Sequence, residues 1–99
     1  MNPENRKIVY HEHGPYGETL SLTSELVPEL QARQVLVEIQ AAAIHPSDIG
    51  LIEGSYGVLR KLPAVGGREA VGKIIQLGTE VKEDLLHTVV SIPDEIGAW

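Results

Sequence analysis

Apolar and polar positions alternate most regularly between Gln34 and Ala43, where Val or Ile occupies positions 35, 37 and 39. The intervening positions 36, 38 and 40 carry Leu, Glu and Gln. A period of two residues places alternate side chains on opposite faces of an extended chain. The pattern therefore predicts a long β-strand over Gln34–Ala43.

Shorter apolar runs bounded by glycines and prolines predict four further strands. They cover Lys7–His11, Glu18–Leu22, Glu69–Leu77 and Val89–Ile92. In the second of these, Leu20 and Leu22 share one face, as in a half-buried strand. Turns or linkers are expected at His13–Gly17, Val27–Ala32, Pro63–Gly67 and Gly78–Glu80.

One short helix is predicted after the long strand. Pro46 suits the first helical position, where a missing N–H costs nothing and the fixed φ is already helical. Apolar residues at positions 49, 51 and 52 give the segment an apolar side, and Gly54 is a typical helix terminator. We therefore expect a helix over Pro46–Glu53, followed by a loop from Ser55 to Leu62.

The order of these elements indicates a mostly β fold, an antiparallel and partly open barrel with one short helix. The strand–helix–strand alternation of a βαβ unit is not seen in the sequence. The chain has 99 residues, so a single domain over residues 1–99 is expected.

Composition and charge narrow the possibilities further. There is no Phe, and the aromatic residues are three Tyr and one Trp, so we expect a core of Val, Ile, Leu and Ala. A net charge of −6 argues against a nucleic-acid partner, which would need a basic surface. The absence of cysteine excludes disulfides and thiolate-ligated zinc. No apolar run approaches the ~20 residues that span a bilayer, and no signal peptide is visible, so no membrane partner is expected.

The leading candidate for a functional site is the polar cluster His45-Pro46-Ser47-Asp48, at the junction of the long strand and the helix. Side chains at such a junction commonly project into clefts. Ser47 or Asp48 can also accept hydrogen bonds from the unpaired N–H groups of the first helical turn. A capping role and a binding role are compatible, and both stay open.

Tyr56 lies in a glycine-flanked loop, between Gly54 and Gly57. A tyrosine hydroxyl is protonated at neutral pH, so it can donate a hydrogen bond or a proton to a developing oxyanion. On spacing alone, a loop residue that covers apolar surface is the simpler interpretation.

Two other clusters are weaker candidates. His11 and His13 would share one face of a strand, but further metal ligands are not apparent, so a solvated strand end is expected. The segment Gly66–Gly72 leads into a strand, whereas a dinucleotide-binding fingerprint leads from a strand into a helix. We expect a structural role there, with Arg68 and Glu69 in ion pairs across the barrel.

Read in order, these segments resemble the N-terminal GroES-like domain of medium-chain dehydrogenases/reductases. Each motif is short, but their order and spacing make the resemblance specific, and it covers essentially the whole chain. The matching segments are Ala41–Asp48, Tyr56, Leu62–Gly72, and Leu77-Gly78 followed by Val81.

The resemblance is to a zinc-free branch of that superfamily. Zinc enzymes carry Cys at the position of His45 and His at that of Arg68, beside a glutamate that matches Glu69. Here no cysteine is present, and a guanidinium stays protonated and cannot ligate zinc. No metal is therefore expected.

Within this branch the chain is similar to the mitochondrial-type trans-2-enoyl thioester reductases, with the quinone oxidoreductases next. Pro46–Ile49, Ile52–Tyr56 and Leu62–Gly67 match that family's Pro-Ser-Asp-Ile, Ile-x-Gly-x-Tyr and Leu-Pro-Ala-Val-Gly-Gly. The chain departs from the family in several places, each of which changes a side chain near a motif. His45 replaces an Asn, Arg68 and Ala70 replace smaller or neutral residues, and Leu86–Val89 replaces a Gly-Asp-x-Val turn. The last change should alter that turn, since Gly and Asp supply turn geometry.

This resemblance implies an NADPH-dependent oxidoreductase that reduces the C=C bond of a 2-enoyl thioester. It assigns Tyr56 to the substrate thioester, and His45, Ser47 and Asp48 to the cofactor. A quinone is the alternative small-molecule substrate. A stand-alone GroES-like binding or structural module is the alternative class of protein.

The resemblance also sets expectations for the parent protein. No Gly-x-Gly-x-x-Gly occurs in these residues, so we expect the Rossmann cofactor domain to be absent from this chain. We expect a fragment that binds NADPH weakly and is inactive alone. A homo-oligomer is a further expectation, as is a cytoplasmic location, or a mitochondrial one in a eukaryote.

Overall fold

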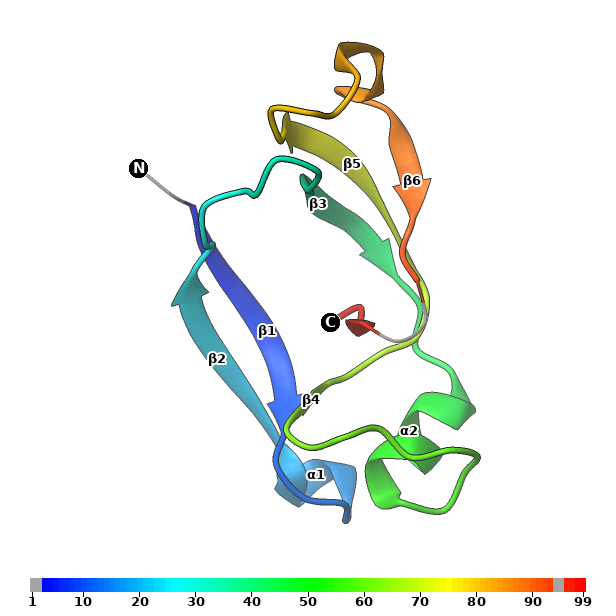
Figure 1. Cartoon of the computed structure of the whole chain (residues 1–99). Coiled ribbons are helices and arrows are strands. Elements are labelled where there is room, and N and C mark those ends of the chain that lie inside the picture. The colour runs from blue at the N-terminus through cyan, green and yellow to red at the C-terminus, as the bar shows by residue number, and fades with distance from the viewer. Residues whose placement is uncertain (1–2, 94–95) are drawn as a thin grey trace.

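The structure is a computed structural model that describes residues 3–93 and 96–99. Its strands form two three-stranded antiparallel sheets, which stand side by side with the two α-helices at one end (Figure 1). No strand is shared between the two sheets. This arrangement confirms the mostly β, partly open architecture.

The first sheet has the strand order β2-β1-β4. Its central strand β1 (Glu4–Tyr10) pairs along its whole length with β2 (Leu20–Leu26). On its other side, β1 pairs with the short β4 (Ala64–Val65). The short helix α1 (Tyr16–Thr19) lies in the connection between β1 and β2.

The second sheet has the order β3-β5-β6. It consists of β3 (Val35–Ala42), β5 (Ala70–Leu77) and β6 (Val89–Ser91), and the 3-10 helix η1 (Glu83–Leu85) connects the last two. The register of β3 against β5 shifts between Leu36 and Val37 and again between Ile39 and Ala41. These irregularities interrupt the alternation that the sequence predicts, because a bulge turns later side chains to the other face.

Helix α2 (Pro46–Glu53) has the predicted bounds. Pro46 occupies a first-turn position, and Gly54 ends the helix in the left-handed conformation, with φ 89°. The helix buries Leu51 and Ile52, and Ile52 belongs to the core cluster, so α2 is anchored to the core.

The centre of the core is formed by Tyr10, Ile52 and Ala64. Tyr10 is only 1% exposed, so the expected all-aliphatic core is wrong at this position. Leu20, Leu62 and Trp99 pack against the cluster. In a chain without Phe, the tyrosine ring supplies the aromatic volume where β1 meets α2.

The structure corrects several of the predicted elements. The first strand covers Glu4–Tyr10 rather than Lys7–His11, and the second extends to Leu26 rather than ending at Leu22. Ala64–Val65, inside the expected turn, forms strand β4, because a short edge strand tolerates the neighbouring Pro and Gly residues. Residues 16–19 form α1, which is too short to show a helical period, and so the second strand begins at Leu20. Leu22 is 62% exposed rather than half-buried, since β2 is an edge strand.

The C-terminal residues lie between the two sheets (Figure 1). The Ile8 N–H donates to the Trp99 carbonyl at 3.2 Å. The indole Nε1–H of Trp99 donates to the carbonyl of Ala43 at 3.1 Å. Trp99 therefore joins β1 to the segment that leads from β3 into α2.

Candidate functional site

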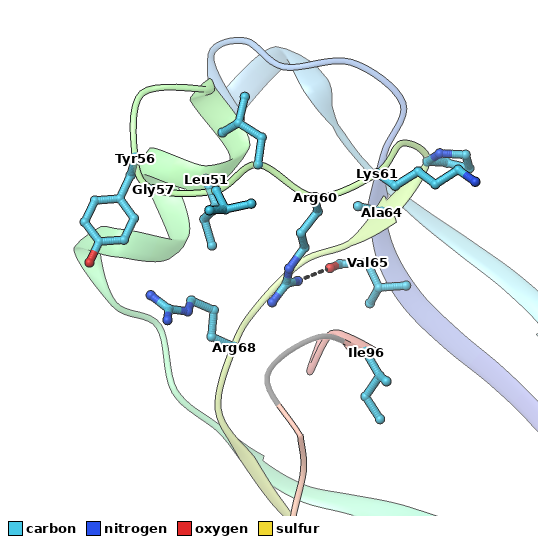
Figure 2. A pocket seen from close by; sticks show the side chains of 12 residues that line it. Leu51, Tyr56, Gly57, Arg60, Lys61, Ala64, Val65, Arg68 and Ile96 are labelled. Carbon is cyan, nitrogen blue, oxygen red and sulfur yellow. Dashed lines mark hydrogen bonds between the residues drawn. The ribbon is translucent and has the colours of Figure 1, made fainter.

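Tyr56 lies on the loop that follows α2, and half of its surface is exposed. Its ring stands at the edge of a cavity of about 700 Å³ (Figure 2), which is within the size range of small-molecule sites. Leu51 of α2, Val65 of β4 and Ile96 of the C-terminal segment also line this cavity. Several elements thus bring a phenol hydroxyl to the edge of a largely apolar hollow.

Three basic side chains line the same cavity: Arg60, Lys61 and Arg68. The Nη1 of Arg60 donates to the carbonyl of Val65 at 2.6 Å (Figure 2). The guanidinium carbon of Arg68 lies 6.0 Å from the centroid of the Tyr56 ring, at the outer limit of a cation–π contact. Among the lining residues that the structure describes, none is acidic. Basic side chains that precede and follow β4 thus line one cavity.

The charge of Arg60 also acts on the core beneath the cavity. Burial raises the pKa of the Tyr10 phenol, and the positive charge of Arg60 partly offsets that rise. The offset is the smaller of the two effects. The Tyr10 hydroxyl is therefore a neutral group at physiological pH.

His45 and Ser47 line an adjoining groove of about 370 Å³. Arg68 lines both the groove and the larger cavity, which places the two hollows side by side. The Nε2 of His45 lies 3.0 Å from Oε2 of Glu69. Glu69 thus contacts the residue before α2, whereas the sequence-based expectation was an ion pair across the barrel.

The side chain of Asp48 stabilises the start of α2. Its side chain is 1% exposed, and Oδ2 accepts the backbone N–H of His45 at 2.7 Å. This is the reciprocal bond of a capping box, in which the third helical residue reaches back to the residue before the helix. From the sequence, we expected Asp48 to accept hydrogen bonds from the N–H groups of the first helical turn. The observed donor is instead the backbone N–H of His45, the residue before the helix.

Gly66 and Gly67 pack against the indole of Trp99. A Cβ on Gly66 would lie 2.5 Å from Trp99 Cε3, and one on Gly67 would lie 2.4 Å from Trp99 Cδ1. Gly67 also has a φ of +85°, a conformation that favours glycine. The glycine pair therefore has a packing function, in agreement with the structural role expected for this segment.

The histidines after β1 do not form a metal site with other described residues. His11 is exposed, whereas His13 is partly buried and its ring centroid lies 5.9 Å from that of Tyr10. Within residues 3–93 and 96–99, no group of three or more His, Asp or Glu side chains is placed to hold a metal ion. The zinc-free assignment, which rests on His45 and Arg68, stays a prediction.

The predicted site residues thus separate into two sets. Tyr56, His45 and Ser47 lie on adjoining hollows that Arg68 connects, whereas Asp48 is committed to the helix start. Sequence patterns do not single out Arg60 and Lys61. Two adjacent basic residues shortly after Tyr56, in an acidic chain, are the signal that could have identified them.

Comparison with known families gives a match over most of the chain. The profile of the alcohol dehydrogenase GroES-like domain matches residues 31–92. The chain is 43% identical over 76 residues to the mitochondrial enoyl-[acyl-carrier-protein] reductase of Rattus norvegicus, covering 77% of this chain and 20% of that protein. It is 38% identical over 100 residues to the corresponding Arabidopsis thaliana reductase, covering 100% of this chain and 27% of that protein. The chain therefore spans about a quarter or less of the length of these relatives.

Solved structures show the same fold. A Bacillus thuringiensis protein assigned as an NADPH:quinone reductase matches with a TM-score of 0.86 and 27% identity, over 98% of this chain and 29% of that one. The mitochondrial 2-enoyl thioester reductase heterodimer Etr1p/Etr2p of Candida tropicalis matches with a TM-score of 0.88 and 23% identity, over 100% of this chain and 30% of that one. Etr1p has also been solved as a complex with NADP and crotonyl-CoA, which matches over 98% of this chain and 30% of that one, with a TM-score of 0.87 and 21% identity.

The helices in the described part of the chain are all too short or too polar to cross a bilayer.

Proposed function

Because the chain belongs to the family of alcohol dehydrogenase GroES-like domains, we propose that it is the substrate-binding domain of an NADPH-dependent reductase of 2-enoyl thioesters. The observation that carries the proposal is Tyr56 at the edge of a 700 Å³ cavity with apolar and basic walls (Figure 2). The relatives with the reported identities are enoyl-[acyl-carrier-protein] reductases, which supports this choice of reaction.

Tyr56 is the residue proposed to act on the substrate. When an enoyl thioester accepts a hydride at its β carbon, negative charge builds on the thioester oxygen. A phenol hydroxyl at the edge of the cavity can donate a hydrogen bond to that oxygen, which lowers the free energy of the charged transition state. The apolar side chains of Leu51 and Val65 in the lining would contact the acyl chain.

The groove beside the cavity fits one end of a nicotinamide cofactor. Its imidazole and hydroxyl, from His45 and Ser47, are groups that hydrogen-bond a carboxamide. Asp48 would act indirectly, since its carboxylate fixes the backbone of His45. A nicotinamide cofactor bound there supplies the hydride.

Most of the cofactor contacts would come from a Rossmann domain outside residues 1–99. The chain exposes 6943 Å², whereas a compact monomer of 10.8 kDa exposes about 5,500 Å². Its radius of gyration is 14.7 Å, against about 13 Å for a compact domain of this length. This excess surface is what a domain presents when a neighbour normally covers part of it. The isolated chain would then be inactive, and its cytoplasmic or mitochondrial location and its oligomeric state stay predictions.

Quinone reduction is the second candidate. The Bacillus thuringiensis protein assigned as an NADPH:quinone reductase is 27% identical to this chain and has a TM-score of 0.86 against it. A quinone would also place an oxygen that gains negative charge in the cavity, so Tyr56 could serve either reaction. Substrate comparison in the parent protein separates the two.

The test is a steady-state assay of the full-length parent with NADPH and either crotonyl-CoA or a benzoquinone. We expect turnover of crotonyl-CoA, and a loss of about 10²–10³-fold in kcat for Tyr56→Phe, the effect of removing one oxyanion donor. Tyr16→Phe is the matched control, because Tyr16 is 52% exposed in α1. Unchanged turnover in Tyr56→Phe would remove this residue from the mechanism, and turnover of the quinone alone would favour the second candidate.

A further inference from the structure

The Tyr56 cavity adjoins a second hollow, a groove of about 810 Å³ between the two sheets. Val65 of β4 and Ile96 of the C-terminal segment line both hollows. Figure 2 shows their side chains on the side of the cavity away from the Tyr56 ring. These two side chains therefore form a wall that separates the cavity from the groove.

The backbone that carries this wall is held in place by close contacts. The Ala98 N–H donates to the Gly66 carbonyl at 2.9 Å. A Cβ on Gly97 would lie only 2.6 Å from the Cβ of Val65, so the segment packs directly against β4. The position of Ile96, next to Gly97, is thus fixed by the fold. Its side chain is 63% exposed, so its truncation should leave the core intact.

The groove beyond the wall has an apolar side that the second sheet forms. Val37 and Ile39 of β3 and Ile75 of β5 line it. Ile39 is 43% exposed and Ile75 is 38% exposed, so part of their apolar surface lies open in the described chain. Covering such surface with an alkyl chain raises affinity by about fourfold for each methylene buried. An alkyl chain that passed the wall would therefore gain affinity in the groove.

We propose that Ile96 is a specificity-determining residue, which closes the far side of the cavity and restricts the substrates to 2-enoyl thioesters with short acyl chains. A short acyl group whose thioester oxygen lies at Tyr56 ends inside the cavity, whereas a longer one meets the side chain of Ile96. This inference rests on the proposed function, because it takes the cavity as the site of the acyl group.

The experiment is an NMR titration of the 99-residue chain, followed through backbone amide shifts. The probes are the N-acetylcysteamine thioesters of trans-2-butenoic and trans-2-decenoic acid, which differ only in the length of the acyl chain. In the wild type, both probes should shift the amide of Gly57, which lines the cavity. Neither should shift the amide of Ile39, which lines the groove. A shift of Ile39 in the wild type would overturn the inference, because the wall would not stop the longer chain.

Ile96→Ala should admit the longer chain to the groove. We expect the decenoyl probe to shift the Ile39 amide in this variant. Its affinity relative to the butenoyl probe should rise at least about tenfold over the wild type, as burial of two further methylenes would give. Ile44→Ala is the matched control and should keep the wild-type ratio, because Ile44 is 75% exposed and lines neither hollow. The same spectra report whether each variant is folded.

The outcomes separate this inference from the proposed function. If neither probe shifted Gly57, the cavity would not be the acyl site, and the inference would fall with that part of the proposed function. Binding of both probes to folded Ile96→Ala with an unchanged affinity ratio would overturn the inference alone.

The full-length parent gives a second measurement. There, Ile96→Ala should raise the ratio of kcat/KM for trans-2-decenoyl-CoA to that for crotonyl-CoA by about tenfold, for the same reason. An unchanged ratio would contradict the inference, since it would mean that the longer chain finds no room beyond the wall.

Discussion

Gly50 of α2 and Tyr56 of the following loop are in closer contact than any residue with a side chain at position 50 would allow. A Cβ built on Gly50 would lie 2.6 Å from the Cβ of Tyr56. The contacted atom is next to the backbone, so it cannot swing away as the tip of a flexible side chain could. The loop is held there by the Ser55 N–H, which donates to the Gly50 carbonyl at 2.9 Å. The absence of a side chain at Gly50 therefore fixes where the phenol stands.

The first prediction is that Gly50→Ala displaces Tyr56 while α2 stays helical. Alanine is the better helix former, but the clash forces the loop away from the helix, at a cost of about 1–3 kcal/mol. In the parent enzyme we expect kcat to fall by up to about 10²-fold, because displacement by about 1 Å is enough for such a loss. NMR shifts of the amides at 55–57 would report the displacement directly.

Gly17→Ala is the control for this prediction. Gly17 lies in α1, and a Cβ there would meet nothing within 4 Å. This variant should keep wild-type turnover and wild-type amide shifts at 55–57. Wild-type kcat and shifts in Gly50→Ala as well would show that the loop does not depend on this contact.

The fold was largely predictable where a pattern repeats or a terminator is present. The bounds of α2 follow from Pro46 and Gly54, and the long strand follows from its alternation. Two-residue strand β4 escaped prediction, because Ala64 and Val65 are too few to show a period. The burial of Tyr10 also depends on long-range packing, which pairs it with Leu20 and Ala64.

The candidate site was predictable only in part. Tyr56 and His45 stand in recognisable motifs, and the structure places them at adjoining hollows. That Arg60 and Arg68 enter the same cavity depends on the path of β4 between them, which no local pattern reveals. The contact of Gly50 with Tyr56 likewise depends on how the loop folds back onto the helix.

The second prediction concerns the alkaline limit of stability. Burial raises the pKa of Tyr10, so as the pH rises the unfolded chain loses this proton before the folded chain does. Above pH ~10, the usual tyrosine pKa, the unfolded state then binds fewer protons, and the free energy of unfolding falls as pH increases. This contribution is fully present below the unfolded pKa and is lost as the pH rises through the folded one. Its slope is at most about 1.4 kcal/mol per pH unit.

Urea unfolding of the chain between pH 8 and pH ~11 would measure this effect. Tyr10→Phe should show a shallower alkaline loss than the wild type, because it removes the titrating hydroxyl and keeps the ring. Tyr16→Phe, at an exposed position, should follow the wild-type curve. If the Tyr10→Phe and wild-type curves were parallel, Tyr10 would not be the group responsible.

The third prediction concerns His87, which lies between η1 and β6. Its φ is 69°, and in this left-handed region a side chain with a Cβ costs roughly 1–2 kcal/mol. His87→Gly should therefore raise the free energy of unfolding by about 0.5–1 kcal/mol, after allowing for the greater freedom of glycine in the unfolded chain. Thermal and urea unfolding would measure the gain.

His87→Ala separates the backbone effect from loss of the imidazole. Alanine has the same strain at a positive φ, so this variant should not be stabilised. A similar gain in both variants would mean that the side chain of His87, and not its backbone conformation, is unfavourable.

The last prediction separates the stabilisation of the start of α2 by Asp48 from the contact with the cofactor proposed for Ser47. Asp48→Ala removes the acceptor for the His45 N–H and should lower the free energy of unfolding by about 1–2 kcal/mol, as loss of a helix cap does. Ser47→Ala removes a hydroxyl from the groove and should change stability by less than about 0.5 kcal/mol. In the parent enzyme, however, Ser47→Ala should raise the KM for NADPH with little change in kcat, because a ground-state contact is lost. An unchanged KM would remove Ser47 from the cofactor contacts, and an unchanged stability of Asp48→Ala would refute its role in holding the start of α2.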